Sequence, residues 1–358
     1  MSSSTNYNDC TRSIRRNLPL LRVFLALVLF FLLLYRAPLP RIASAFRTAL
    51  TSPRILSGGF VLVGLALLTG AMRWHLLLRA QQLGISLSDA IRYFFSGQFF
   101  NVFLPGGCGG DLIRMYWVAR RFPGRRTSAV GTVVLDRVLG LYFYIAAACL
   151  FIGTAGIPGL PDAALAATRV AAVLLLGASL AVWTLVLVRP TPLQKAFSDP
   201  PGSGDEARGM PLIRALARST SLYLHRPLVI LGALALSALN FGLLAVACVC
   251  FSHSLNLPIS LLRVLAAFAV ATLIGALPLT PGAIGLREGT YVLLLQPAGV
   301  SASGALALGL LMYFAGALWG LPGALVFATE PTRSPRELAH RARAFLRGGL
   351  CSTGKGRC

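Results

Sequence analysis

Long apolar runs alternate with short polar stretches along most of the chain. A helix needs about 20 predominantly apolar residues to cross the hydrocarbon core of a bilayer, which is about 30 Å thick. The first such run follows a basic segment, as in a signal peptide, but its length favours an uncleaved helix. Runs of this size predict membrane-spanning helices at residues 18–35, 55–72, 128–153, 163–188, 228–251 and 302–328.

Two further apolar runs, at 91–104 and 264–277, are too short to cross. Each has about 14 residues and would reach only about 21 Å as a helix. The first stops at PGGCGG (105–110), the second stops at Pro278 and at the Pro-Gly pair 281–282, and charged residues follow both breaks. The pattern predicts an all-α polytopic membrane protein with about six full spans and two re-entrant broken helix hairpins.

Arginine and lysine are distributed unevenly among the predicted loops. With six crossings both termini lie on one side, and we place that side in the cytoplasm, together with Arg73 and the basic connector 189–227. The nearly charge-free 154–168 loop then falls outside, in agreement with the positive-inside rule. The arginines of loop 36–54 fall outside too and have no explanation. We expect a multi-pass protein of the cell (inner) membrane.

The polar connector divides the transmembrane region into two halves. Residues 55–153 and 228–328 have the same order of span, broken hairpin and span, and three crossings separate their starting points. They are therefore inserted in opposite directions, which predicts the inverted repeat found in many secondary transporters. The expected domains are a cytoplasmic basic tail (1–17), a transmembrane domain (18–328, with halves 18–188 and 228–328 and connector 189–227) and a basic, disordered cytoplasmic tail (329–358).

The composition agrees with a membrane protein, with 56% hydrophobic and 12% charged residues and a mean hydropathy of +0.73. Soluble proteins carry about 25% charged residues. The net charge of +22 resides in loops and tails, where it meets anionic lipid rather than nucleic acid. The seven cysteines contain no CxxC pair and the four histidines show no ligand spacing. We therefore expect no metal, no cofactor and no catalytic nucleophile–base pair.

The two broken segments are the best candidates for a functional site. Backbone that leaves helical geometry within a bilayer must be buried in protein or line a wet cavity. The helix after each break presents free N–H groups and a partial positive charge, and Arg114 and Arg287 add full charges. Together they favour a phosphate, which in a membrane belongs to a lipid headgroup. The candidate headgroup-binding residues are Gln98, Asn101, Gly106, Gly107, Gly109, Gly110, Asp111, Arg114, Asp136, Arg137, Pro281, Gly282, Gly285, Arg287 and Glu288.

Several of these residues have simpler roles open to them. Asp111 stands where a helix N-cap is expected. Gln98 and Asn101 share one helix face, from which they bind substrate, hold helices together or satisfy the broken backbone. Asn240 is expected to hold helices together.

The charged pair in the 128–153 span needs partners, because a charge within a bilayer is costly. Asp136 and Arg137 are adjacent and point about 100° apart on a helix, so each should pair elsewhere. We expect Arg114 as the partner of Asp136, and either a headgroup or Glu288 as the partner of Arg137. Arg287 and Glu288 are also able to pair with each other or with a neighbour.

Three motifs resemble the lysylphosphatidylglycerol synthase transmembrane region, or flippase-like domain, family. They are GQFFNVFLPGGCGGDLIR (97–114), LDR (135–137) and PLTPGAIGLREG (278–289). Cys108 and Ala283 depart from the family pattern without removing a charged position. In well-known members this region moves an aminoacylated phospholipid between leaflets and a separate soluble domain attaches the amino acid.

The resemblance implies a lipid translocase without the synthase domain, because only about 30 residues follow the last span. Its substrate does not carry over, so we expect a phosphate-bearing lipid moved by alternating access. A membrane-embedded transferase acting on a lipid-linked substrate and a non-catalytic membrane partner stay open as alternatives. A homo-oligomer and a separate lipid-modifying enzyme stay open as partners.

Overall fold

The computed structural model is helical throughout the part of the chain that it describes, and it contains no strand there. The described residues are 39–103, 109–155, 161–163, 165–174, 177, 223, 226–277, 279–280 and 282–329. The helices are α2 (Leu39–Leu50), α3 (Pro53–Ala80), α4 (Leu87–Phe103), α5 (Gly109–Arg121), α6 (Arg126–Ala155), α10 (Pro227–Ser254), α11 (Leu261–Gly275), α12 (Leu286–Leu295) and α13 (Ala302–Thr329), with a 3-10 turn, η2 (Gln296–Ala298).

Four of these helices are long and apolar enough to cross a membrane. They are Pro53–Ala80, Arg126–Ala155, Leu228–Ser254 and Ala302–Phe327, and they contain four of the six predicted spans. The predicted span 18–35 lies outside the described residues, and 163–188 is described only in part, including a short apolar helix, Leu165–Leu174. The tail 1–17, nearly all of connector 189–227 and residues 330–358 also lie outside them. The chain is thus a multi-pass membrane protein.

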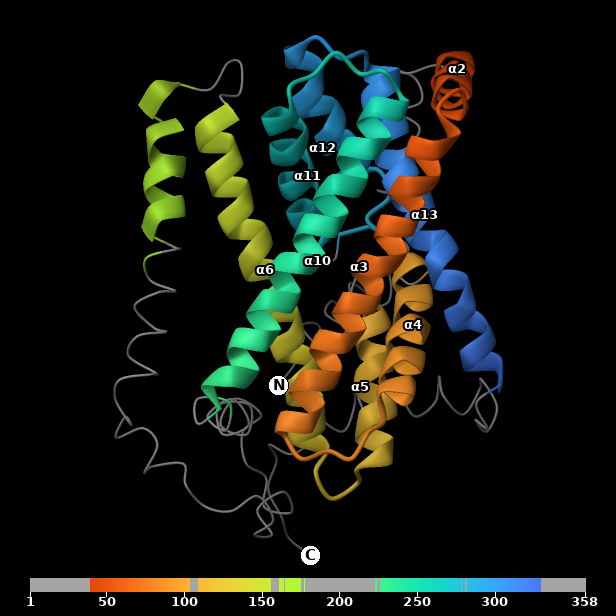
Figure 1. Ribbon diagram of the computed structural model, residues 1–358, viewed down its shortest axis with the longest axis vertical. Helices are drawn as coiled ribbons and strands as arrows, with labels where there is room; N and C mark the ends of the chain where they lie inside the picture. Colours follow the sequence, from red (N-terminus) through yellow and green to blue (C-terminus); the bar gives the residue numbers. More distant parts are fainter. Residues whose placement is uncertain are drawn as a thin grey trace, which may run out of the picture.

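The two short apolar runs form short helices that stop at the breaks. α4 ends at Phe103 and α11 ends at Gly275, close to the predicted ends at 104 and 277. α5 packs against α4 and α12 packs against α11. Figure 1 shows the first pair at the lower end of the molecule and the second pair at the upper end.

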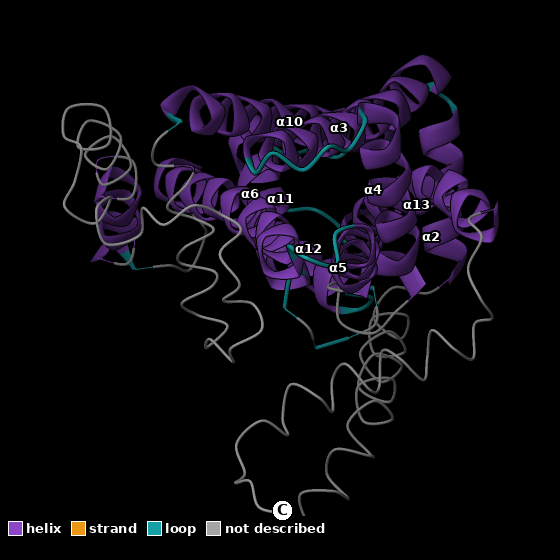
Figure 2. Cartoon of the chain, turned by 90° about the horizontal axis from the view of Figure 1, so that it is seen from below, coloured by secondary structure: helices purple, strands orange, loops and turns teal. Residues whose placement is uncertain are grey.

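The helices surround a central region. α3 packs along α10, α4 packs along α13, and α6 packs along α11. Seen from below, α3 and α10 run across one side, with α5 and α12 on the opposite side (Figure 2). The helices that follow the two breaks, α5 and α12, therefore lie on the same side of the central region.

The predicted loop 36–54 contains a helix that the sequence did not indicate, α2, over residues 39–50. Ile42 and Ala49 are buried in the main apolar cluster, while Arg47 is exposed. The apolar positions recur with the helical period and produce one buried face. The span-based interpretation missed α2 because its apolar face is too narrow to form a continuous run.

Glycine lets α4 and α5 approach with their backbones in contact. A Cβ placed on Gly97 would lie 2.9 Å from the carbonyl oxygen of Gly110, and a Cβ on Gly110 would overlap the carbonyl of Gly97. No larger residue fits at either position without separating the helices. This contact fixes the start of α5 against the wall of the central cavity.

Candidate functional site

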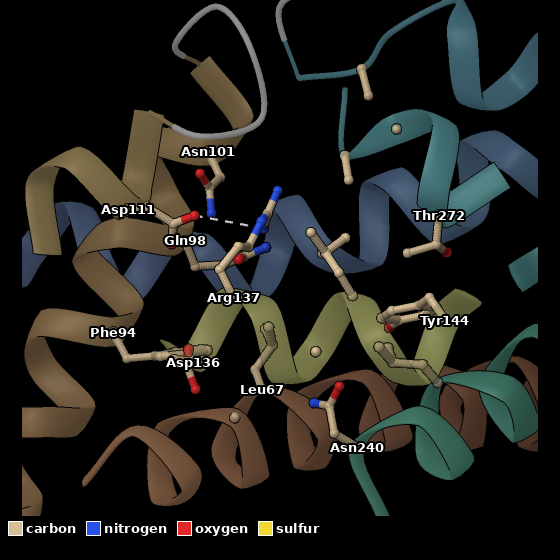
Figure 3. A pocket seen from close by; sticks show the side chains of 18 of the residues that line it. Leu67, Phe94, Gln98, Asn101, Asp111, Asp136, Arg137, Tyr144, Asn240 and Thr272 are labelled. Carbon is tan, nitrogen blue, oxygen red and sulfur yellow. Dashed lines mark ion pairs between the residues drawn. The ribbon is translucent and has the colours of Figure 1, made fainter. Parts of the chain in front are cut away.

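A cavity of about 260 Å³ lies among the helices that flank the two breaks. Its walls come from α3, α4, α5, α6, α10, α11, α12 and α13 and from the turn before α12. In Figure 3, Gln98, Asn101 and Arg137 gather at one end and Tyr144 and Thr272 lie toward the other. The structure therefore joins residues that lie more than 200 positions apart in the sequence into one chamber.

Most of the charged and amide candidates line this cavity. They are Gln98, Asn101, Asp111, Arg114, Asp136, Arg137 and Arg287, and the candidate Gly282 lines the cavity as well. Four other candidates are described but do not line it: Gly109, Gly110, Gly285 and Glu288. Gly106, Gly107 and Pro281 lie outside the described residues.

Asp136 is the centre of a buried ion-pair network. Its Oδ1 lies 2.7 Å from Nε of Arg73, and its Oδ2 lies 3.0 Å from Nη2 of Arg114. The side chain is 3% exposed. The predicted pair of Asp136 with Arg114 is confirmed, and Arg73 is a second partner that the sequence did not indicate.

Asp111 joins the same network from the first turn of α5. Its Oδ1 lies 3.2 Å from Nη1 of Arg114 and its Oδ2 lies 3.6 Å from Nη1 of Arg137; Figure 3 marks the contact with Arg137. Glu288 was the wrong protein partner for Arg137, and the headgroup alternative stays a prediction. Because the Arg137 contact is long and its side chain is 35% exposed, this arginine is held weakly.

Arg114 is held by two carboxylates and two aromatic rings, although its Nε has no acceptor. Its two terminal nitrogens are engaged by carboxylates, and its guanidinium carbon lies 4.3 Å from the ring centroid of Trp74 and 4.7 Å from that of Phe94. Cations over aromatic faces are attracted to the ring quadrupole. Arg114 therefore stabilises the two carboxylates and has little freedom to move toward a ligand.

The start of α5 is satisfied by a side chain of α4. The backbone N–H of Gly110 donates to Oδ1 of Asn101 at 2.8 Å, so Asn101 satisfies the broken backbone, one of the three roles left open for it. Gln98 makes no hydrogen bond to another described residue, and its side chain faces the cavity (Figure 3). Gln98 is thus the amide that is available to a ligand.

The second break turns through left-handed backbone. The φ angles of Gly282, Ala283 and Gly285 are 58°, 60° and 84°, a region that favours glycine. The N–H of Gly285 donates to Oε2 of Glu288 at 2.8 Å, and Glu288 is 1% exposed. Glu288 thus acts as a cap inside the first turn of α12.

Arg287 differs from the other cavity arginines. It lines the cavity, but within the described ranges it makes no ion pair; its Nε is buried without an acceptor, as is the Nε of Arg114. A Cβ placed on Gly275 would lie 3.3 Å from this Nε, so the guanidinium rests against the end of α11. Four arginines and two aspartates line the cavity, and its net charge is therefore positive.

Sequence reasoning missed one charged and several polar residues of the wall. Arg73 was wrongly assigned to a cytoplasmic loop; α3 continues to Ala80, and Arg73 is 7% exposed within it. Asn240 holds helices together as expected, since its Nδ2 donates to the carbonyl of Ala66 at 2.5 Å, but it also lines the cavity. The remaining polar lining residues are Tyr144, Thr272 and Tyr313.

The described residues contain no group of three histidine, cysteine or acidic side chains that could hold a metal ion. The donor set of the cavity is instead arginine, amide and hydroxyl, which suits an oxyanion.

Comparison with known proteins identifies a family. The model of the family described as "Lysylphosphatidylglycerol synthase TM region" matches residues 20–322, which include both breaks and every candidate residue. A search of curated proteins found no match. With most of its length matched, the chain belongs to the lysylphosphatidylglycerol synthase transmembrane-region family.

Proposed function

We propose that this protein moves a phosphate-bearing lipid between the leaflets of the membrane, with the headgroup held in the central cavity. The observation that carries the proposal is Arg287, a guanidinium that faces the cavity and makes no ion pair with any described residue. A cation kept in such a place is costly unless a ligand supplies the counter-charge. A phosphate accepts hydrogen bonds from arginine in a bidentate manner.

The cavity arginines divide into two roles under this proposal. Arg287 and the weakly held Arg137 contact the phosphate, and Gln98 adds a neutral donor. Arg114, which the sequence suggested as a second phosphate ligand, has both terminal nitrogens committed to carboxylates. It acts as a positioning residue that holds Asp111 and Asp136 in place.

The packing pattern supports an inverted repeat with two re-entrant hairpins. If α3, α4, α5 and α6 are matched in order with α10, α11, α12 and α13, each helix contact in one half has an equivalent. The contact of α4 with α13 corresponds to that of α11 with α6, and the contact of α5 with α6 corresponds to that of α12 with α13. The contact of α3 with α10 corresponds to itself. The two helix pairs lie at opposite ends of the molecule (Figure 1). In our proposal each pair enters and leaves the bilayer on one side.

Such an arrangement suits alternating access. Two units related by inversion adopt equivalent conformations that open a shared site to one side or the other. While the phosphate crosses, the arginines replace its hydration shell. The acyl chains of the lipid pass between the helices and stay in the hydrocarbon core of the bilayer. We place both termini in the cytoplasm of the cell (inner) membrane and leave α2 at the opposite interface, where Arg47 meets lipid headgroups.

Reconstitution into liposomes tests this function. Fluorescent phospholipids in the outer leaflet are quenched by dithionite, and a flippase raises the quenched fraction above the half seen in empty liposomes. We expect the wild type and Arg121→Ala, an exposed arginine outside the cavity, to do so, and Arg287→Ala to lose most of the effect. Wild-type protein that leaves quenching at the empty-liposome level, with and without an imposed proton or sodium gradient, would refute the proposal.

A further inference from the structure

We infer that the headgroup carried by this protein is anionic and contains no ammonium group. This inference rests on the proposed function and names the substrate class of the same cavity. It separates the chain from a carrier of cationic aminoacylated lipids, although its family is named after a synthase of such a lipid.

A carboxylate is the side chain that neutralises a ligand ammonium, and the carboxylate oxygens of the cavity are all occupied. Asp136 faces Arg73 with Oδ1 and Arg114 with Oδ2, at 2.7 and 3.0 Å. Asp111 faces Arg114 with Oδ1 and Arg137 with Oδ2, at 3.2 and 3.6 Å. Each of the four oxygens therefore already has a guanidinium, and a ligand ammonium would have to displace one.

The third acid near the cavity is also engaged. Glu288 caps the backbone of Gly285 at 2.8 Å, is 1% exposed and does not line the cavity. The residues of the two breaks that fall outside the described ranges, 104–108, 278 and 281, include no acidic residue in the sequence. Around the cavity and its breaks, no acid is left for a cationic headgroup.

Positive groups are in excess. Among the described lining residues, the four guanidinium groups outnumber the two carboxylates by two. Arg287 is unpaired there and Arg137 has a single contact at 3.6 Å with 35% of its side chain exposed. These two arginines would repel an ammonium group, whereas a phosphate diester would neutralise part of the excess positive charge. The cavity thus selects by attraction for an anion and by repulsion against a cation.

Binding to the purified full chain in detergent tests the inference without requiring transport. We would titrate the protein with phosphatidylglycerol, lysyl-phosphatidylglycerol and phosphatidylcholine that have matched acyl chains. Soluble glycerol phosphate, which has the anionic group but no acyl chains, would serve as the non-lipid ligand. We expect phosphatidylglycerol to bind at least about tenfold more tightly than each of the others. Arg287→Gln should weaken phosphatidylglycerol by about 10- to 100-fold, the loss of one charge-assisted contact, while Arg121→Gln changes nothing.

Lysyl-phosphatidylglycerol that binds as tightly as phosphatidylglycerol, or an Arg287→Gln variant with unchanged preference, would overturn the inference. Soluble glycerol phosphate bound as tightly as the lipid would overturn the assignment to a lipid headgroup. These failures are distinct from a failure of the proposed function, which would appear as selective binding without flip-flop in liposomes.

Discussion

Replacing Asp136 by asparagine should destabilise the protein more than any other loss of a single charge in the described part of the chain. The substitution keeps the shape of the side chain but removes the charge that two buried guanidinium groups share. It also sets an amide N–H₂ against a guanidinium donor, because asparagine offers a single acceptor oxygen. The network then contains two buried cations, those of Arg73 and Arg114, with one remaining carboxylate.

The expected magnitude follows from burial. Asp136 is 3% exposed, and the side chains of its partners Arg73 and Arg114 are 9% and 6% exposed. Breaking a buried ion pair by removing one partner costs about 3–5 kcal/mol. The surface pair of Asp89 with Arg121 has a similar distance, 3.2 Å, but its side chains are 24% and 44% exposed; such pairs contribute about 0–1 kcal/mol. Asp89→Asn is therefore the matched control.

Unfolding by SDS in mixed micelles, followed by tryptophan fluorescence, measures the loss of unfolding free energy in Asp136→Asn and in the control Asp89→Asn. A double variant, Arg73→Met with Asp136→Asn, restores the charge balance and should lose at least about 1 kcal/mol less than the sum of the single variants. Equal losses for Asp136→Asn and Asp89→Asn, or strict additivity in the double variant, would show that the buried network does not hold α3, α5 and α6 together.

Two glycine substitutions test the geometry of the breaks. Gly110→Ala places a Cβ on the carbonyl of Gly97 and should destabilise the protein by about 1–3 kcal/mol in the same unfolding assay, whereas Gly58→Ala, with nothing within 4 Å, should be close to neutral. Gly275→Ala places a Cβ 3.3 Å from Nε of Arg287 and should reduce lipid flip-flop severalfold with a smaller loss of stability; unchanged flip-flop would contradict the role given to Arg287.

The two helix breaks could be predicted from the sequence because proline, glycine and charged residues affect the helix at their own position. Proline lacks the N–H that a helix needs, and short apolar runs cannot cross a bilayer. The ends of α4 at Phe103 and α11 at Gly275 accordingly lie within two residues of the predicted ends. The partner of Asp136 was also predictable, since a buried carboxylate requires a cation and Arg114 follows the first break.

The remainder of the site depends on contacts that no local pattern shows. Arg73 ends an apolar run and so was placed in a loop, yet α3 continues past it because Asp136 and Ser237 satisfy its guanidinium within the helix bundle. α2 was missed since its apolar positions recur with the helical period instead of forming a run. Thr272 and Tyr144 are ordinary polar residues in apolar helices until the fold turns them toward the cavity.

The two arginines that follow the breaks differ because the charged residues around them differ. Arg114 follows the first break and is neutralised by Asp136 of α6. Arg287 follows the second break, and α13, which packs against α12 as α6 packs against α5, contains no acidic residue. The first half therefore presents ion-paired arginines to the cavity, whereas the second half brings Arg287, which makes no ion pair with a described residue. A ligand that supplies this charge would bind both halves at once, so the occupied and empty cavity need not favour the same conformation.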